Sequence, residues 1–479
     1  MKTSKDAPDS SGPSEFPEVP EPPRRSVNTP PASVSNAPPI PRGKAINIVA
    51  GTLGHFVEWF DWNIYGVMAV IFASQIFPSD SPAASVTLAF ATYAIGFLIR
   101  PLSGLIISPL ADRFGRRGVL ALTISLMAGG SLLIGFTPPY AAIGWLAPAM
   151  FLTARVAQGI SAGSEQQGAI AFMVEHAPAN RRALFGSLTN FASGVSILAA
   201  TGTAALITTT LSKGDLNAWG WRIPFVIGGV LGLIGLVVRA RADESPEVDK
   251  SAKVKTNSRS RLGSLLRNHP KALLQSAALS APAVAYYTWS TFLPTYAALT
   301  TGQSLASALT ANLIGIGVFV VLVPLVGAVS DRIGRRKPFP IIGAIGMVVL
   351  FYPLMLLLTN AGFGAYVLVS VSGYVVLAIW QAVYPTIQAE LFPAAVRVSG
   401  IGLSHQLVIA LFGGTAPLIA SAFLGAGQPM LVAVYMIVIV GLSLIAYFTL
   451  PETGPRRNKP SETVSFKDAN AKVAERITS

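Results

Sequence analysis

The sequence has no cysteine and few charged residues, and each scarcity removes a class of protein. Without cysteine there is no disulfide and no thiolate metal ligand, and four histidines spread over 479 residues argue against a histidine metal site. Charged residues make up 12% of the chain, whereas an average soluble domain has about 25%. The sequence also lacks a phosphate-binding loop and a nucleophile constellation. We therefore expect no metal, no cofactor and no catalytic residues.

Long apolar stretches dominate instead, since 52% of the residues are hydrophobic. A helix needs about 20 apolar residues to cross the ~30 Å hydrocarbon core of a bilayer. The sequence therefore predicts an all-α membrane protein with twelve transmembrane helices, of which the sixth is short. The expected spans are 46–74, 85–110, 118–136, 145–170, 184–210, 223–238, 272–300, 306–328, 338–358, 366–388, 399–424 and 429–450.

The net charge of +13 is distributed very unevenly between the expected loops. With the N-terminus inside, the five internal loops hold 19 lysines and arginines, whereas the six external loops hold only Lys213 and Arg222. This positive-inside bias predicts a multi-pass protein of the cell membrane with both termini in the cytoplasm. The basic loops then face anionic lipid, and we expect no nucleic-acid partner.

Two patterns recur at nearly one offset along the chain. LADRFGRR at 110–117 returns as VSDRIGRR at 329–336, and Glu-x-x-Pro-x-x-x-Arg occurs at 175–182 and again at 390–397. This predicts duplication of a six-helix unit, and two such halves around a central cavity are a transporter architecture. The expected parts are a disordered Pro-rich cytoplasmic tail (1–44), the N-terminal half (45–238), a cytoplasmic central loop (239–271), the C-terminal half (272–454) and a second cytoplasmic tail (455–479).

Six segments carry a resemblance to a known family. They are GHFVEWFDWNIYG (54–66), FLIRPLSG (97–104), ADRFGRR (111–117), ARVAQGISAGSE (154–165), WGWRIPF (219–225) and SDRIGRR (330–336). In these residues the chain resembles the major facilitator superfamily, and more narrowly its metabolite–proton symporter family. That family includes proline/betaine, 2-oxoglutarate, shikimate and citrate transporters. The resemblance implies the major facilitator fold and symport of a small organic ion with protons.

Charged residues inside the spans are the first functional candidates, because a buried ionisable group in a membrane helix costs at least a few kcal/mol. Glu58 and Asp61 lie three residues apart, so they are neighbours on one helical face near mid-membrane. Two carboxylates this close cannot easily both be charged in a low dielectric, which predicts proton coupling through at least one of them. The alternatives are a protonated acid or a permanent ion pair that only holds helices together. We expect His55, one turn away, to be a packing residue rather than a relay.

The fourth span carries a polar stripe. On an ideal helix Arg155, Gln158, Glu165 and Gln166 fall within roughly 100° of one another and should face the cavity. Arg100, near the middle of the second span, can bind a carboxylate with two hydrogen bonds. For both arginines, contact with substrate and neutralisation by a buried acid remain open alternatives.

The C-terminal half has no charged residue inside its spans, so its candidates are polar and aromatic. Gln381 and Tyr384 are the better substrate-site predictions because they lie well inside the tenth span. Tyr286, Tyr287 and other aromatic residues could hold a quaternary ammonium or an aromatic ring, although packing is the expected role for most of them.

Repeated charges are expected at the cytoplasmic helix ends. The simpler interpretation is that these positive charges only set the orientation of the protein in the membrane. For Asp112 and Asp331 the resemblance favours a gate, in which carboxylates pair with basic groups and helix termini when the molecule faces outward, whereas the extra arginines are expected to set topology. The predicted gate residues are Asp112, Arg113, Arg116, Asp331, Arg332 and Arg335.

These observations predict a secondary transporter that imports a small organic acid or zwitterion with protons by alternating access, and that functions as a monomer. The alternative on the same fold is an exporter of organic acids or drugs by proton antiport. A membrane sensor would not need mid-membrane charges, and a channel would need a continuous polar pore that the spans lack. With two buried cations, Arg100 and Arg155, a tricarboxylate fits poorly.

Overall fold

The computed structural model describes residues 42–162, 165–240, 263, 265–359 and 362–455. For residues 42–53, 104–106, 108–109, 111–117, 120, 165 and 239–240 it describes the backbone only. Both predicted tails and most of the predicted central loop fall outside these ranges, so the boundaries proposed for them remain predictions.

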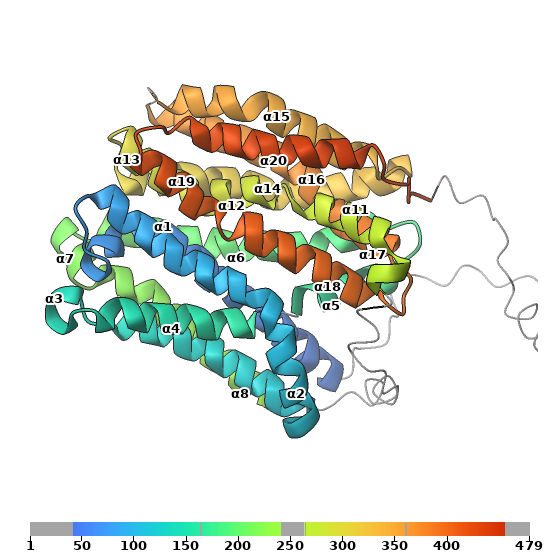
Figure 1. Ribbon diagram of the computed structural model, residues 1–479, viewed down its shortest axis with the longest axis horizontal. Helices are drawn as coiled ribbons and strands as arrows, with labels where there is room; N and C mark the ends of the chain where they lie inside the picture. The colour runs from blue at the N-terminus through green and yellow to red at the C-terminus, as the bar shows by residue number, and fades with distance from the viewer. Residues whose placement is uncertain (1–41, 163–164, 241–262, 264, 360–361, 456–479) are drawn as a thin grey trace, which may run out of the picture. The chain divides into compact units, whose positions relative to one another are not determined.

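Helices account for nearly all of the described chain (Figure 1). The N-terminal half consists of α1 (Arg42–Ile76), α2 (Pro82–Phe136), α3 (Tyr140–Ile143), α4 (Leu146–Ser161), α5 (Glu165–Glu175), α6 (Arg182–Thr210), α7 (Lys213–Ala218), η1 (Gly220–Arg222) and α8 (Ile223–Ala240). The C-terminal half consists of α11 (Pro270–Ser280), α12 (Ala283–Tyr287), η2 (Thr288–Phe292), α13 (Leu293–Thr300), α14 (Leu305–Ile333), α15 (Pro338–Leu358), α16 (Phe363–Gln381), α17 (Tyr384–Leu391), α18 (Arg397–Val408), η3 (Ile409–Gly413), α19 (Ala416–Gly425) and α20 (Leu431–Tyr447).

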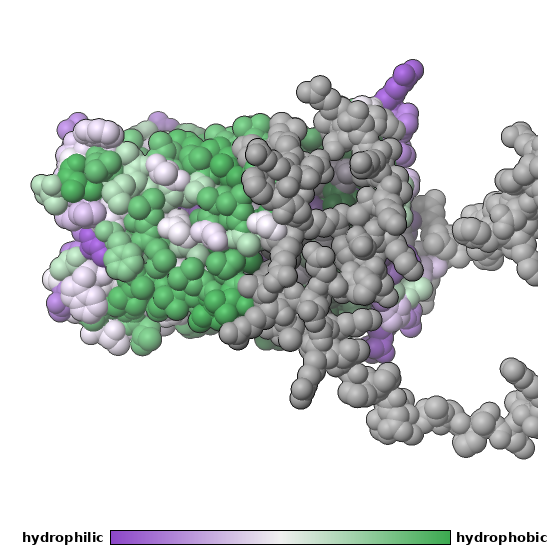
Figure 2. Space-filling model, turned by 90° about the horizontal axis from the view of Figure 1, so that it is seen from below, coloured by the Kyte–Doolittle hydropathy of each residue, from purple (hydrophilic) through white to green (hydrophobic). Residues whose placement is uncertain are grey.

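Each of the twelve predicted spans corresponds to a helix or a run of helices in the described part of the chain. Seven helices there are long and apolar enough to cross a membrane on their own, and two shorter apolar helices accompany them. The remaining crossings are α1, α4 with α5, and α11 to α13. Figure 2 shows a broad apolar belt along the side of the bundle, with hydrophilic residues at its ends. This is the distribution expected of a helical bundle whose solvent is lipid.

The halves meet along long helices. In Figure 1, α4 and α8 lie on one side of the bundle and α15 and α20 on the opposite side, while α6 and α14 pack together between them. We call the end that holds the connections 176–181, 334–337 and 392–396 the inner end. The charge bias predicts that this end is cytoplasmic.

Helix α2 supplies two crossings because it folds back beside α4. Gly96 near its start lies against Arg155, and Gly130 near its end lies against Gln158. Arg155 and Gln158 are one turn apart on α4. Both arms of α2 therefore pass the same level of α4, which brings polar residues of the second and third crossings next to those of the fourth.

Prolines interrupt several crossings, and polar side chains satisfy the carbonyl groups that they leave free. A proline has no N–H, so it leaves the carbonyl four residues before it without its helical donor. Pro294 frees the carbonyl of Ser290, which accepts from Asn63 Nδ2 at 3.2 Å. Pro385 frees that of Gln381, which accepts from Asn190 Nδ2 at 2.6 Å. In both cases an asparagine of the N-terminal half closes a gap in the C-terminal half, so the breaks also bind the halves together.

Candidate functional site

The two carboxylates of α1 each have an arginine partner. Glu58 Oε1 lies 3.3 Å from Arg100 Nη2, on the first arm of α2. The Arg100 guanidinium lies over the rings of Trp62, at 4.3 Å, and Phe97, at 4.1 Å. Cation–π contacts of this kind partly replace the hydration that the cation loses by burial.

Asp61 forms a second ion pair in a cluster of four buried polar side chains. Its Oδ2 accepts from Arg155 Nη1 at 3.0 Å, and its Oδ1 accepts from the Ser131 hydroxyl. Gln158 Nε2 donates to the Ser131 hydroxyl at 3.2 Å. Three crossings, the first, third and fourth, are thereby joined through one carboxylate, which is the arrangement that makes a buried ion pair tolerable.

From the sequence, Glu58 and Asp61 are expected to disfavour each other's negative charge. In the structure they form ion pairs with different arginines. Their predicted mutual repulsion is relieved because each faces its own cation. The pairs differ in burial: the side chains of Asp61 and Arg155 are 0% exposed, whereas those of Glu58 and Arg100 are 11% and 5% exposed. A proton must travel through water or polar groups, so the pair that retains access is the better exchange site.

A small cavity adjoins Glu58 within the N-terminal half. Its volume is about 30 Å³, and its lining includes Glu58, Thr123, Met127, Ser161 and Gly232. A space of this size holds one water molecule. His55, one turn toward the inner end, accepts from or donates to the Ser193 hydroxyl at 3.0 Å. A hydrogen-bonded histidine between α1 and α6 fits the packing role that we expect for it.

Aromatic side chains of both halves meet beside the Glu58–Arg100 pair. Trp59 stacks on Tyr287, with ring centroids 6.0 Å apart, and meets Tyr286 edge-on at 6.3 Å. Phe97, which lies under the Arg100 guanidinium, contacts Tyr287 at 5.2 Å. Tyr286 and Tyr287 immediately precede the π-helix η2, a distortion that is frequent at functional sites. The centre of the bundle therefore combines one reachable ion pair with aromatic faces.

The polar stripe predicted for the fourth crossing is only partly formed. Arg155 and Gln158 are both buried around Asp61. Helix α4 ends at Ser161 and α5 begins at Glu165, so the ideal-helix angle does not carry over to Glu165 and Gln166. The Glu165 side chain lies outside the described residues, and its predicted role stays a prediction.

Gln381 and Tyr384 lie at the break between α16 and α17. The Tyr384 ring stacks on Trp380 at 4.8 Å and on His405 at 6.2 Å. The side-chain Oε1 of Gln381 is buried and has no hydrogen-bond partner among the described residues. Gln381 is therefore the substrate candidate of this half with an unused polar atom, while Tyr384 is held by packing.

At the inner end, the duplicated Glu-x-x-Pro-x-x-x-Arg pattern forms reciprocal ion pairs between the halves. Glu175 of the N-terminal half pairs with Arg397 of the C-terminal half. Glu390 of the C-terminal half pairs with Arg182 of the N-terminal half, at 3.5 Å. Each copy of the pattern supplies the acid for one pair and the base for the other, so the two pairs link the halves at this end.

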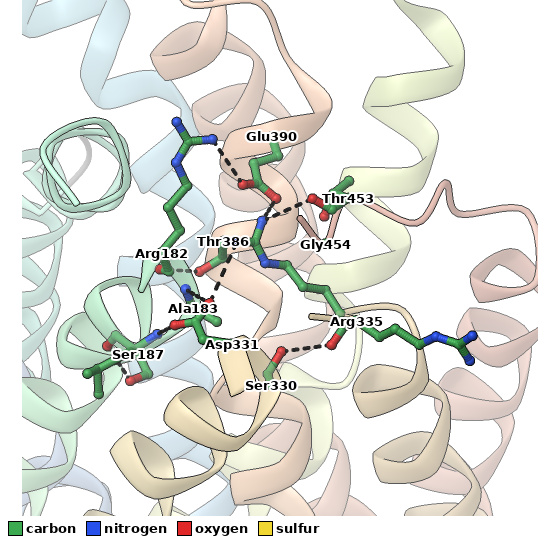
Figure 3. Close-up of polar contacts among 12 residues, drawn as sticks. Arg182, Ala183, Ser187, Ser330, Asp331, Arg335, Thr386, Glu390, Thr453 and Gly454 are labelled. Carbon is green, nitrogen blue, oxygen red and sulfur yellow. Dashed lines mark hydrogen bonds and ion pairs between the residues drawn. The ribbon is translucent and has the colours of Figure 1, made fainter. Parts of the chain in front are cut away.

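Asp331 occupies the predicted gate position and caps a helix of the other half (Figure 3). Its two carboxylate oxygens accept from the backbone N–H groups of Ala183 and Leu184, at 3.0 and 2.8 Å, in the first turn of α6. Helix N-termini favour negative charge, so the contact is both a hydrogen bond and a dipole interaction. Asp331 also lies 3.8 Å from Arg336 Nη2.

Arg336, rather than Arg332 or Arg335, is the arginine that joins this cluster. Arg336 pairs with Glu390 and donates to the carbonyl of Thr453 at 3.3 Å. Burial lowers its pKa to about 10, which leaves it charged at neutral pH.

Arg332 and Arg335 are exposed, and Figure 3 shows the Arg335 side chain pointing away from the cluster. The first copy of the motif, Asp112, Arg113 and Arg116, lies where side chains are not described.

Sequence reasoning missed several of these residues. Asn63, Asn190 and Ser131 are polar residues inside spans, but no charge drew attention to them. Prolines four residues after Ser290 and Gln381 were a usable signal for the two asparagines, since each freed carbonyl needs a donor from elsewhere. Among the described residues, no group of three or more acidic or histidine side chains could hold a metal ion.

Comparison with known proteins identifies the family. The model of the Major Facilitator Superfamily matches residues 51–417. The chain belongs to the major facilitator superfamily. The crystal structure of a D-xylose–proton symporter matches with a TM-score of 0.68 over 86% of this chain and 98% of that one, at 19% identity. At that identity the likeness establishes the fold alone, with twelve transmembrane helices in two six-helix halves.

Relatives in the superfamily match over most of their length. The chain is 33% identical over 425 residues to the glycine betaine/proline/ectoine/pipecolic acid transporter OusA of Dickeya dadantii, covering 86% of this chain and 84% of that protein. It is 31% identical over 383 residues to the alpha-ketoglutarate permease of Escherichia coli, covering 80% and 88%. It is 32% identical over 395 residues to the shikimate transporter of the same species, covering 80% and 89%. This major facilitator protein is therefore a multi-pass secondary transporter, not an enzyme.

Proposed function

We propose that this protein is a proton-coupled symporter that takes up a small organic acid or zwitterion by alternating access. The observation that carries the proposal is the Glu58–Arg100 ion pair, buried between aromatic rings yet not sealed from solvent. Transport of a small organic solute also agrees with the names of the relatives, and proton-coupled symport on this fold agrees with the D-xylose–proton symporter.

The Glu58–Arg100 pair couples proton binding to substrate binding, because Glu58 and the substrate carboxylate compete for the Arg100 guanidinium. While Glu58 is ionised it occupies the Arg100 guanidinium at 3.3 Å. A substrate carboxylate can take that position only if Glu58 gives it up, and a buried glutamate without its cation binds a proton. Binding one carboxylate therefore requires binding one proton. Asp61 is the structural member of the two acids, since its pair with Arg155 is 0% exposed.

The charge count favours a substrate with one carboxylate. Arg155 is already held by Asp61, which leaves Arg100 as the better placed of the two predicted substrate arginines. Trp59, Tyr286 and Tyr287 offer ring faces to the remainder of the substrate, where a positively charged or apolar group is stabilised. A monocarboxylate or a zwitterion satisfies these groups, whereas a dicarboxylate leaves one charge without a partner. The OusA relative is named for zwitterions and the shikimate transporter for a monocarboxylate.

The ion pairs at the inner end are the proposed cytoplasmic gate. Release to the cytoplasm requires Glu175–Arg397, Arg182–Glu390 and the Asp331 cap on α6 to separate. One side chain of each ion pair keeps contact with solvent, Glu175 at 40% and Arg182 at 42% exposed, and ion pairs in contact with solvent contribute little individually, which suits contacts that break in every cycle. The proposal includes cytoplasmic termini, a functional monomer and no nucleic-acid partner.

Transport in proteoliposomes tests the proposal. The panel is proline, glycine betaine, shikimate, an aromatic monocarboxylate and 2-oxoglutarate, assayed by counterflow and by uptake driven by an inward proton gradient. Wild-type protein should accumulate a one-carboxylate cargo. Glu58→Gln should keep counterflow but lose gradient-driven accumulation, because a permanently neutral side chain cannot exchange a proton. Asp215→Asn, at an exposed acid in the first turn of α7, is the matched control and should behave as wild type.

Two outcomes would replace the proposal. If the proton gradient accelerates efflux of the accepted cargo, the protein is an antiport exporter. If Glu58→Gln accumulates cargo as wild type does, proton coupling does not pass through this residue.

A further inference from the structure

A second cavity opens at the inner end of the C-terminal half, away from the central site. Its volume is about 740 Å³. It is lined by Gly334, Arg335, Lys337, Pro338, Ile341, Ile342 and Glu452. These residues come from the turn between α14 and α15, the first turns of α15 and the segment that follows α20. The proposed transport cycle has no use for this space.

A close contact between two glycines lies beside the cavity, and one of them, Gly334, lines it. Gly334 ends α14 with φ +69°, a left-handed conformation that turns the chain toward α15. Gly454 packs directly on that turn, so closely that a Cβ atom on it would lie 2.3 Å from the Gly334 carbonyl oxygen. Any side chain at 454 would push the segment after α20 away from the turn. This contact holds the segment after α20, which carries Glu452, against the turn that carries Gly334.

The lining holds two cationic side chains, Arg335 and Lys337, and one acidic side chain, Glu452, so its net charge is two minus one, or +1. The Glu452 carboxylate is directed to the backbone. Its Oε1 accepts from the N–H groups of Arg336, at 2.7 Å, and Gly454, at 2.9 Å. Lys337 is held in place because its ammonium donates to the Phe448 carbonyl at 2.7 Å, which leaves its other hydrogens available. Arg335 is exposed and points away from the ion pairs of the gate (Figure 3).

Apolar surface continues from the cavity along the membrane-facing side of the bundle. Helices α15 and α20 lie side by side (Figure 1). Ile342, Ile345 and Val349 are exposed on α15 at helical spacing, and Ile445 on α20 and Phe448 directly after it are exposed as well. The cations thus lie at the end of two neighbouring helices that both carry exposed apolar side chains. Positive groups above an apolar face match the charge and the polarity of a phospholipid with an anionic headgroup.

We propose that this cavity binds the headgroup of an anionic phospholipid, with the phosphate between Arg335 and Lys337 and the acyl chains along α15 and α20. The guanidinium and the ammonium supply charge-assisted hydrogen bonds to the phosphate oxygens. The lipid source is favoured over free phosphate because the lining continues into exposed isoleucines, which a soluble anion would not contact. Arg336, next in sequence to Arg335, belongs to the gate, so a bound lipid lies one residue from the contacts that close the inner end.

Native mass spectrometry of the full-length protein in detergent tests this inference. Phosphatidylglycerol and phosphatidylcholine with the same acyl chains are titrated in parallel, and free inorganic phosphate and glycerol phosphate are added as competitors. Phosphatidylglycerol should bind at least tenfold more tightly than phosphatidylcholine. The double variant Arg335→Ala with Lys337→Gln should weaken phosphatidylglycerol about 30-fold, at roughly one fivefold step per cation.

Two further variants keep the inference falsifiable. Arg332→Ala with Lys271→Gln removes two exposed cations of the same end from outside the cavity and should leave the affinity unchanged. Ile342→Trp fills the cavity without changing charge and should also weaken phosphatidylglycerol. Equal binding of both lipids, an equal loss in the control variant, or an unchanged affinity in Ile342→Trp would overturn the proposal. If millimolar free phosphate competes fully with phosphatidylglycerol, the ligand of the cavity is a soluble anion and not a lipid.

Discussion

Replacing Asp61 by asparagine removes the negative charge from the most deeply buried ion pair of the N-terminal half. The substitution leaves Arg155 charged and 0% exposed, 3.0 Å from a neutral group. Asparagine keeps an oxygen that can accept from Ser131, so the hydrogen bond survives while the charge balance does not. The predicted effect is therefore electrostatic destabilisation of the fold, not removal of a coupling group.

The expected magnitude follows from burial. Breaking a buried pair by removing one partner costs about 3–5 kcal/mol, because the remaining charge is left uncompensated. The retained hydrogen bond puts Asp61→Asn at the lower end, at about 3 kcal/mol, or roughly a 100-fold change in the unfolding equilibrium. Glu58→Gln should cost less than half of this, since the Glu58–Arg100 pair keeps contact with solvent.

Thermal and denaturant unfolding in detergent, followed by tryptophan fluorescence, measures the difference. The double variant Asp61→Asn with Arg155→Gln should recover most of the lost stability, because it leaves no buried charge without a partner. The reasoning is refuted if Asp61→Asn unfolds like wild type but cannot accumulate cargo. That result would make Asp61, and not Glu58, the proton-coupling acid.

Three other predictions concern the contacts between the halves. Asn190→Ala leaves a proline-freed carbonyl on α16 without a donor and should destabilise the protein by about 1–3 kcal/mol, measured by the same unfolding assay. Arg397→Glu should open the inner end by placing two acids together, and adding Glu175→Arg should close it again, measured as labelling of a Ser187→Cys probe in this cysteine-free chain. Gly66→Ala should slow counterflow at least tenfold, because the new Cβ would lie 1.8 Å from Thr291 Cγ2 and keep α1 from closing on η2.

Each of these predictions has a control. Thr153→Ala removes an exposed hydroxyl that bonds only within its own helix, and it should not change stability. Labelling that does not respond to the Glu175 and Arg397 charges would mean that this pair plays no part in closing the inner end. Gly129→Ala, at a glycine with open space beside it, should transport normally. Normal counterflow in Gly66→Ala would show that the close approach of α1 and η2 is not required for transport.

Hydropathy, charge bias and repeated motifs determined much of this protein from the sequence alone. They predicted twelve crossings, a duplicated six-helix unit and the family, and they drew attention to Glu58, Asp61, Arg100 and Arg155. These are local properties, because a helix must satisfy its own backbone in lipid and a buried charge is conspicuous in any apolar segment. The orientation of the termini and the role of the tails remain predictions of the same kind.

Only the tertiary structure decided which groups meet. Sequence spacing placed Glu58 beside Asp61, but the fold gives each acid a different arginine, from α2 and from α4. It also showed that Arg336 joins the gate cluster and that each copy of the repeated Glu–Arg pattern pairs with the other copy. Such pairings depend on packing between segments up to 222 residues apart, which no local pattern encodes. Burial then distinguishes a sealed ion pair from one that keeps contact with solvent, the pair that we propose exchanges a proton, because access to solvent is a property of the assembled bundle.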